Sequence, residues 1–177
     1  MSRTLDDWLA YISAQHPAAI ALGLDRVRDV WQRVIPVATG TQPKLAPAVI
    51  TVGGTNGKGS TCAILERIFL ESGYRVGLYT SPHLIRYNER VRVQGNEIGD
   101  EALADAFERV ERARGDVQLT YFEFGTLAAL SIFAHAALDA VILEVGLGGR
   151  LDAVNVIDAD VSAVVTVSLD HQAFLGN

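Results

Sequence analysis

The sequence predicts an α/β fold in which helices flank a mostly parallel β-sheet. Short apolar runs rich in β-branched residues alternate with segments of helical periodicity, and polar or Gly-rich residues follow several of these runs directly. Alternating strands and helices imply parallel strands joined by right-handed crossovers. Ligands bind beyond the carboxyl ends of the strands in such sheets. The residues that follow the strands are therefore the first candidates for a functional site.

The helices are predicted from caps and from apolar spacing. Residues 4–7 resemble a capping box, and apolar residues then recur at helical intervals. A short second helix is expected at residues 25–34. Later helices are expected around Ile64, Leu65, Ile68 and Phe69, around Leu103, Ala106, Phe107 and Val110, and at residues 122–137.

Four strands are predicted from apolar runs. Residues 48–52 form a β-branched run typical of a strand buried in a parallel sheet. The turn-forming residues 39–47 that precede it are expected to form a loop. The other strands are expected at residues 75–79, 139–145 and 161–167.

Composition places the chain among ordinary globular proteins. It has 177 residues, 49% of them hydrophobic and 20% charged, which is enough for one domain with its own core. A net charge of −6 argues against a broad nucleic-acid-binding surface. Cys62 is the only cysteine, so no internal disulfide can form. The N-terminus lacks the pattern of a signal peptide, and the most apolar stretch, 124–134, is too short to span a bilayer. We therefore expect a soluble, cytoplasmic protein without membrane or nucleic-acid partners.

A phosphate-binding loop is predicted at residues 53–60, between a strand and a helix. Small residues allow backbone N–H groups to surround phosphate oxygens, and the helix N-terminus adds favourable partial charge. Lys58 would reach the outer phosphates, and a hydroxyl of Ser60 or Thr61 could approach a metal. The strict general pattern fails, because Val52 and Gly59 stand where it has Gly and Ser or Thr. A Gly-rich turn that binds nothing is the alternative. The predicted nucleotide-binding residues are Gly54, Thr55, Asn56, Gly57, Lys58, Gly59 and Ser60.

The segment Gly54–Ser60 (GTNGKGS) resembles the phosphate loop of the Mur ligase superfamily, and specifically its folylpolyglutamate synthase and dihydrofolate synthase branch. Further segments are similar to that branch in the same order: 20–27, 80–84 with 88–91, 121–126, 144–153, and 170–171 with 175–176. The resemblance implies a P-loop NTPase-like Mur ligase ATP-binding domain over residues 1–177. It also implies that this domain is incomplete and that a C-terminal glutamate-binding domain is absent.

The chemistry that the resemblance implies is ATP-dependent amide formation with ATP and Mg²⁺. The carboxylate of a pteroate or folate is phosphorylated, and the amine of L-glutamate then attacks the acyl phosphate. Phosphorylation supplies the leaving group that a carboxylate lacks. The resemblance further implies that the parent enzyme acts on dihydropteroate, on folates or on both. We expect the fragment alone to be inactive.

The resemblance assigns Ser81, Glu144 and His171 as magnesium ligands, and Lys58, Glu144 and His171 as catalytic residues. Glu144 also stands out from the residues themselves, because a carboxylate at the end of an apolar strand is costly to bury without a compensating cation or donor. A salt bridge to Arg150 or Lys58 is the alternative. Ser81 before a proline is otherwise an ordinary turn residue, and His171 is an unusual ligand for a hard cation.

A pocket for the pterin side of the substrate is implied by three segments. Phe122 could stack on a flat ring and Asp152 could accept hydrogen bonds from ring nitrogens, although core packing explains Phe122 nearly as well. Arg86, Arg90 and Arg92 could face substrate carboxylates, but a solvated strand face is the default interpretation. The predicted substrate residues are Ile20, Ala21, Leu22, Gly23, Thr120, Tyr121, Phe122, Glu123, Leu151, Asp152 and Ala153.

Two alternative functions stay open at this point. A cell-wall ligase of the same superfamily would join amino acids to a nucleotide-sugar peptide, but its loop usually carries two hydroxyl residues after the lysine. A non-catalytic nucleotide-binding module would bind ATP without responding to folates.

Overall fold

A computed structural model of the chain describes residues 3–15, 21–35 and 44–169. Within these residues, one sheet of six strands has the order β4-β3-β2-β5-β1-β6. Its parallel part comprises β1 (Ala48–Gly53), β2 (Val76–Tyr79), β5 (Ala140–Glu144) and β6 (Val161–Val164). The strands β3 (Val91–Val93) and β4 (Asn96–Glu97) add an antiparallel edge next to β2. The predicted α/β class with a mostly parallel sheet is confirmed.

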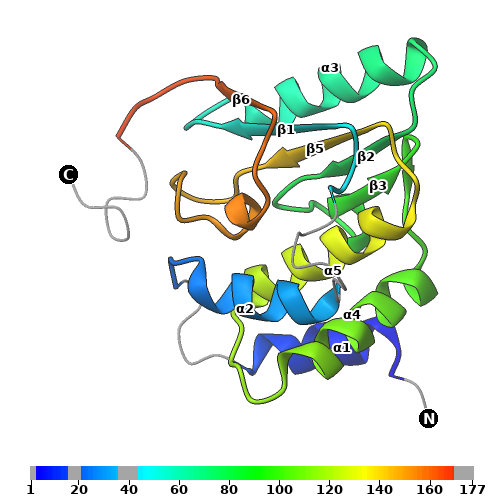
Figure 1. Ribbon diagram of the computed structural model, residues 1–177, viewed down its shortest axis with the longest axis vertical. Coiled ribbons are helices and arrows are strands. Elements are labelled where there is room, and N and C mark those ends of the chain that lie inside the picture. Colours follow the sequence, from blue (N-terminus) through cyan, green and yellow to red (C-terminus); the bar gives the residue numbers. More distant parts are fainter. Residues whose placement is uncertain (1–2, 16–20, 36–43, 170–177) are drawn as a thin grey trace.

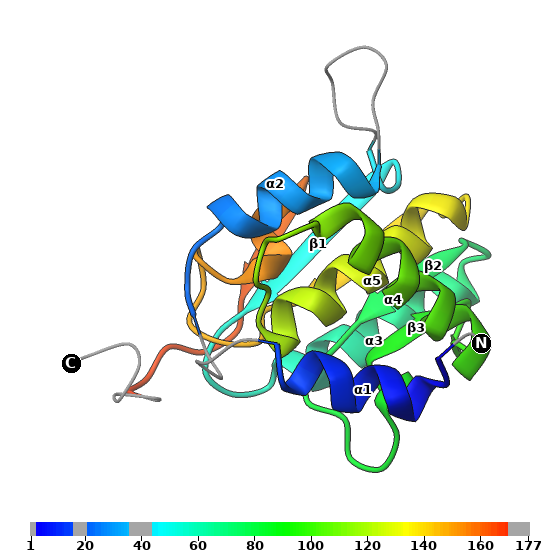
Figure 2. The same cartoon turned by 90° about the horizontal axis from the view of Figure 1, so that it is seen from below.

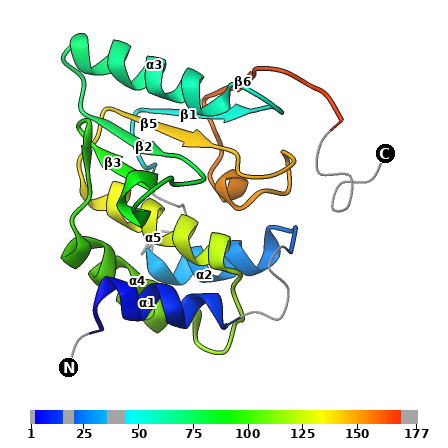
Figure 3. The same cartoon turned by 180° about the vertical axis from the view of Figure 1, so that it is seen from behind.

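Helices cover both faces of the sheet unequally. The helix α3 (Lys58–Glu71) lies alone on one face, and the other four helices lie on the opposite face (Figures 1 and 3). In the view onto that second layer, α4 and α5 lie between α1 and α2 (Figure 2). The bounds of these four are Leu5–Ser13 for α1, Asp25–Val34 for α2, Asp100–Arg114 for α4 and Tyr121–His135 for α5. None of the helices in the described part of the chain is long and apolar enough to cross a membrane.

The alternation of side chains along the strands produces two cores. On the α3 face, a small cluster contains Val52, Cys62 and Leu78, and Cys62 is fully buried. On the other face, a larger cluster includes the buried rings of Trp8 and Phe124. Helices thus cover both faces of the sheet, and the carboxyl ends of its parallel strands stay available for a functional site. In Figure 1 those ends point to the left, where the loop after β5 (orange) and the start of α2 (blue) gather.

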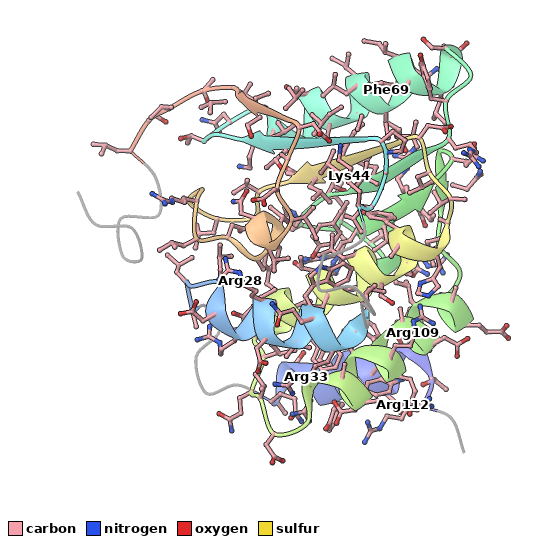
Figure 4. All side chains as sticks on the ribbon, in the orientation of Figure 1. Arg28, Arg33, Lys44, Phe69, Arg109 and Arg112 are labelled. Atoms are coloured by element: carbon pink, nitrogen blue, oxygen red, sulfur yellow. The ribbon has the colours of Figure 1, made fainter. Side chains whose placement is uncertain are left out.

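Surface arginines on the outer helices are largely neutralised by neighbouring acids. Figure 4 shows Arg28, Arg33 and Arg112 on α2 and α4. Arg28 pairs with an aspartate one turn away at 3.4 Å, Arg112 pairs with a glutamate at 3.0 Å, and Arg33 pairs with Asp29. These charges therefore form local pairs along each helix.

Most predicted elements are confirmed with small shifts at their ends. The capping box at Thr4 and Asp7 is present, and α2 has the predicted bounds. Two features differ from the prediction. The hairpin of β3 and β4 was not predicted, and its two-residue turn places Gln94 and Gly95 at positive φ. The last strand ends at Val164 instead of residue 167, because the next backbone groups bond to the phosphate loop.

Candidate functional site

The predicted phosphate loop connects the end of β1 to the start of α3. Gly57 caps the helix in the left-handed region at φ 86°, and Gly54 has φ 134°. A side chain is strained at such angles, so glycine is needed at both positions. The Lys58 ammonium donates to the carbonyl oxygens of Gly54 at 2.8 Å and Thr55 at 3.3 Å. The lysine therefore lies folded over the loop, where its charge can meet a phosphate.

The chain just after β6 holds the phosphate loop in place. The backbone N–H of Thr55 donates to the carbonyl of Thr166 at 2.8 Å. The Thr166 hydroxyl accepts from the backbone N–H of Asn56 at 2.8 Å and donates to the Asn56 carbonyl at 3.0 Å. Ser168 adds two bonds to the Thr55 hydroxyl. A methyl group on Gly54 would lie 2.8 Å from the Thr166 carbonyl oxygen. This contact was not predicted, because the two segments lie 110 residues apart in the sequence.

Glu144 lies at the carboxyl end of β5, beside the phosphate loop. Its side chain is nearly buried, and its Oε2 accepts the backbone N–H of Ser81 at 3.0 Å. A methyl group on Gly59 would lie 3.6 Å from Oε1, so the carboxylate closely faces the start of α3. Burial raises the pKa of Glu144, while the bond from Ser81 and the charge of Lys58 oppose that shift.

The alternative role for Glu144, a structural salt bridge, is not observed within the described residues. A buried carboxylate without an ion-pair partner, near a serine and a helix N-terminus, has the donor chemistry that suits a divalent cation. The structure places the Ser81 backbone N–H against the Glu144 carboxylate, and their role as magnesium ligands stays a prediction. His171 lies outside the described residues, and those that are described contain no cluster of three His, Cys, Asp or Glu side chains able to hold a metal.

Two adjoining cavities open at this edge of the sheet. The phosphate-loop cavity, of about 510 Å³, lies between the loop, the segment after β5 and the chain after β6. The inner cavity, of about 320 Å³, lies between the segment after β5, the start of α5, the start of α2 and Ser81. The two share a wall made by Leu22, Gly146, Leu147 and Leu151. The two cavities are therefore immediate neighbours.

The inner cavity collects most of the predicted substrate residues. Tyr121 is not among its lining residues, and Ile20 lies outside the described residues. The other nine predicted residues line the cavity: Ala21, Leu22, Gly23, Thr120, Phe122, Glu123, Leu151, Asp152 and Ala153. Their role in substrate binding stays a prediction.

Phe122 forms a wall of the inner cavity and also packs against the sheet. Its ring lies 6.1 Å from that of Tyr79, and a methyl group on Gly146 would collide with it at 2.6 Å. Gly146 therefore allows the ring to approach the backbone after β5. The ligand-binding and core-packing interpretations of Phe122 are both compatible with this position.

The acids of the inner cavity also have structural partners. Glu123 completes the capping box of α5 with Thr120, and it forms an ion pair with Arg26 at 2.8 Å. Asp152 caps a short 3-10 helix (Ala153–Val156) and accepts backbone N–H groups at 2.9 and 3.1 Å. Burial raises the pKa of Asp152 to about 6. Asp152 is thus a buried hydrogen-bond acceptor whose ionised form is disfavoured by burial.

The interpretation of three arginines as a solvated strand face is wrong for Arg90. Arg86 is exposed and pairs with Asp100 at 3.0 Å, and Arg92 pairs with the buried Glu66 at 3.1 Å. Arg90 is only 9% exposed and lines the inner cavity. The sequence held no signal for this, because Tyr121, one of the rings that cover Arg90, comes from a distant helix.

Comparisons with known proteins agree with the resemblance. No protein-family model matches the chain. The dihydrofolate synthase/folylpolyglutamate synthase of Escherichia coli is 55% identical over 172 residues, which are 97% of this chain and 39% of that protein. The same enzyme of Haemophilus influenzae is 49% identical over 173 residues, which are 98% of this chain and 38% of that protein.

Solved structures give the same result. The E. coli FolC structure in complex with DHPP and ADP has 53% identity and a TM-score of 0.93, and the match covers 99% of this chain and 41% of that chain. A bifunctional folylpolyglutamate synthase/dihydrofolate synthase with Mn, AMPPNP and L-glutamate bound has 50% identity and a TM-score of 0.88, with the same coverage. The cell-wall branch is not supported by these relatives. The chain spans about two fifths of their length, and it belongs to the dihydrofolate synthase/folylpolyglutamate synthase family.

Proposed function

We propose that this chain is the ATP-binding part of a ligase that adds L-glutamate to dihydropteroate, to folates or to both. The observation that carries the proposal is the shared wall between the phosphate-loop cavity and the inner cavity. It would place a phosphate beside the end of a flat substrate that fills the inner cavity. Relatives that bind ADP with DHPP, or AMPPNP with Mn and L-glutamate, support this arrangement.

In the proposed reaction, a carboxylate oxygen of the substrate attacks the terminal phosphorus of ATP, and ADP leaves. The amine of L-glutamate then attacks the acyl carbon, an amide forms, and inorganic phosphate and a proton are released. Lys58 and the N–H groups at the start of α3 would stabilise the negative charge on the phosphoryl oxygens. Glu144, Ser81 and the predicted ligand His171 would hold Mg²⁺, which supplies charge neutralisation to the phosphates when bound.

Residues 1–177 are not expected to catalyse the whole reaction alone. We propose that residues 1–177 form an incomplete ATP-binding domain and that the glutamate-binding residues lie in the part of the relatives that this chain does not span. The isolated chain is then expected to release no ADP in response to glutamate. Glutamate-dependent ADP release from the pure chain would contradict this. A cytoplasmic location is part of the same proposal.

The first experiment is a calorimetric titration with Mg-ATP, with and without dihydropteroate. We compare the unmutated chain with Lys58→Ala and with Lys44→Ala, which changes the only other lysine of the chain. Lys44 lies outside both cavities and pairs with Asp160 at 2.6 Å. Removing Lys58 should weaken ATP binding about 10- to 100-fold, as expected when charge-assisted hydrogen bonds to phosphate are lost.

The outcomes separate the candidate functions. Binding of ATP that is lost in Lys58→Ala and kept in Lys44→Ala supports the phosphate loop, and a heat change with dihydropteroate supports the folate ligase. Equal binding by both variants and the unmutated chain would rule out the proposed loop. Tight ATP binding without any response to dihydropteroate or folates would favour the non-catalytic nucleotide-binding module instead.

A further inference from the structure

Arg90 is a buried cation in the wall of the inner cavity. It ends the 3-10 helix Tyr87–Arg90, just before β3, and is 9% exposed. Its Nε donates to Nδ1 of His83 at 2.7 Å. The guanidinium carbon lies 5.3 Å from the ring centre of Tyr87 and 5.8 Å from that of Tyr121. Two rings and a histidine therefore fix the plane of the guanidinium.

No acid neutralises Arg90 within the part of the chain that the structure describes. No carboxylate there lies close enough to its guanidinium to form an ion pair. The two acids that line the same cavity are engaged elsewhere, Glu123 with Arg26 and Asp152 with backbone N–H groups. Because a buried charge is costly unless it is paired or hydrogen-bonded, this position is explained best by a ligand.

The neighbouring phenols cannot supply the missing negative charge. Burial raises the pKa of Tyr87 well above its usual value and also raises that of Tyr121, the two rings beside the guanidinium. Both hydroxyls are neutral at physiological pH. The guanidinium gives its Nε–H to His83 and also lies within hydrogen-bonding reach of the Tyr79 hydroxyl. Its two terminal nitrogens together carry four N–H groups in a planar fork, so donors remain for a ligand.

The inner cavity thus contains two buried and opposite hydrogen-bonding groups. Asp152 is a carboxylate that accepts, Arg90 is a cation that donates, and the two do not form an ion pair with each other. Phe122 adds a flat apolar wall. The matching ligand is a flat heteroaromatic ring that offers N–H donors to Asp152 and a carbonyl oxygen to Arg90. A pterin ring, which is an aminopyrimidinone fused to a second ring, has both groups.

We propose that Arg90 is a specificity-determining residue, whose guanidinium donates to the carbonyl oxygen of the substrate's pterin ring, and that His83 is its positioning residue. This inference rests on the proposed function, because it assumes that the inner cavity binds a pteroate. It adds a donor that selects rings carrying a carbonyl group over rings carrying an amino group at the same position. Removing a charged donor from a neutral carbonyl should weaken binding about 10- to 100-fold.

The test measures binding of two probes by calorimetry. One is dihydropteroate, and the other is its analogue in which an amino group replaces the ring carbonyl. The unmutated chain should bind dihydropteroate at least about 10-fold more tightly than the analogue. Arg90→Met, which keeps much of the aliphatic stem, should lose most of this preference. The control is Arg86→Met, an exposed arginine outside the cavity, which should retain the preference.

Binding of Mg-ATP to the same variants shows whether the phosphate-loop cavity is intact. Arg90→Met should bind ATP as the unmutated chain does. An equal loss of affinity for both probes in Arg90→Met, with the preference kept, would overturn the proposal and leave Arg90 a purely structural role. If Arg90→Met does not fold, Arg90→Lys replaces it. This variant keeps the charge but not the planar fork, and it should bind dihydropteroate several-fold more weakly with a reduced preference.

An Arg90→Lys variant with undiminished affinity and preference would also overturn the proposal. Failure of the proposed function gives a different result. The unmutated chain would then bind neither probe at saturating concentration, and both the function and the role of Arg90 would be rejected.

Discussion

The phosphate-loop cavity is lined largely by glycines and small polar residues, whereas the inner cavity beside it has three buried charged side chains, Arg90, Glu123 and Asp152, in its wall. In the loop, backbone groups do most of the holding, as in the bonds between Thr55, Asn56 and Thr166. In the inner cavity, side chains make these contacts: Glu123 pairs with Arg26, Asp152 accepts backbone N–H groups, and Arg90 donates to His83.

This difference indicates how each cavity responds to substitution. A loop built from backbone groups depends on space and on φ angles, so the smallest added side chain should be the most damaging change. A cavity built from buried charges depends on pairing and protonation, so isosteric changes of charge should matter most. The following predictions test this contrast, beginning with the largest expected effect.

Adding a methyl group to the phosphate loop should abolish its function. In Gly54→Ala, the new carbon would lie 2.8 Å from the Thr166 carbonyl oxygen, at a φ of 134° that side chains rarely adopt. We expect nucleotide binding to weaken by roughly 100-fold or more and the free energy of unfolding to fall by about 2 kcal/mol. Calorimetry and urea unfolding measure these effects. Gly149→Ala lines the same cavity in open space and should be tolerated. Equal behaviour of the two variants would break the contrast.

The buried Asp152 should make stability depend on pH. Its pKa is raised from 3.8 to about 6, so the folded chain binds more protons than the unfolded chain between these values. The stability that this gives is present below pH 4 and is lost as the pH rises through 6, by about 3 kcal/mol in total. Urea unfolding across this range should show that decline for the unmutated chain relative to Asp152→Asn.

Asp152→Asn also changes the free energy of unfolding for a second reason, because its amide nitrogen replaces one oxygen that accepts a backbone N–H. That second contribution does not change with pH, so the slope is the test. If the free energy of unfolding changes with pH in the same way for both proteins, the pKa of Asp152 is not raised by folding.

The ion pair beside the inner cavity should contribute to stability more than the surface pairs do. In Arg26→Met, the carboxylate of Glu123 would lose its 2.8 Å partner while its side chain stays 4% exposed. We expect a loss of about 2 kcal/mol, below that of a fully buried pair because Arg26 is 35% exposed. Thermal and urea unfolding measure it. Arg28→Met on the same helix removes an exposed pair at 3.4 Å and should cost about 0.5 kcal/mol or less. A larger effect at Arg28 than at Arg26 would contradict the prediction.

The smallest effect is expected where a side chain supports the phosphate loop at the surface. Thr166→Val removes a hydroxyl that accepts from and donates to Asn56, but solvent can replace these bonds. We expect a loss of about 1 kcal/mol and nucleotide affinity that falls a few-fold. Thr166→Ser keeps the hydroxyl and should bind ATP as the unmutated chain does. If both variants bind equally, the remaining bonds from Thr55 to Thr166 and Ser168 hold the loop without the Thr166 hydroxyl.

The two cavities also differ in how far the sequence predicted them. The phosphate loop is contiguous, and its position between β1 and α3 follows from an apolar run, glycines and a helical pattern. Glu144 was identified because a carboxylate ends an apolar strand. The loop's link to Thr166 was not predicted, because hydrogen bonds between segments more than a hundred residues apart leave no local pattern.

The inner cavity was predicted only through the family resemblance, since its walls come from separate segments of the chain. Periodicity and composition do not show that Arg90 turns inward, since its neighbour Arg86 is exposed and has a similar sequence context. The antiparallel hairpin was missed for a related reason. Its strands are very short, and its turn uses Gln94 before Gly95 in place of the more typical Asn or Asp.

The single cysteine can report when α3 separates from the sheet. Cys62 is fully buried in the first turns of α3, directly behind the phosphate loop, and burial raises its pKa to about 12. A thiol reagent can modify it only when the helix separates from the sheet, so the labelling rate counts such openings. Nucleotide that binds to the start of the same helix should slow that rate. The labelling rate of Cys62, measured with and without nucleotide, therefore reports how strongly a bound ligand stabilises the start of α3, and no engineered probe is needed.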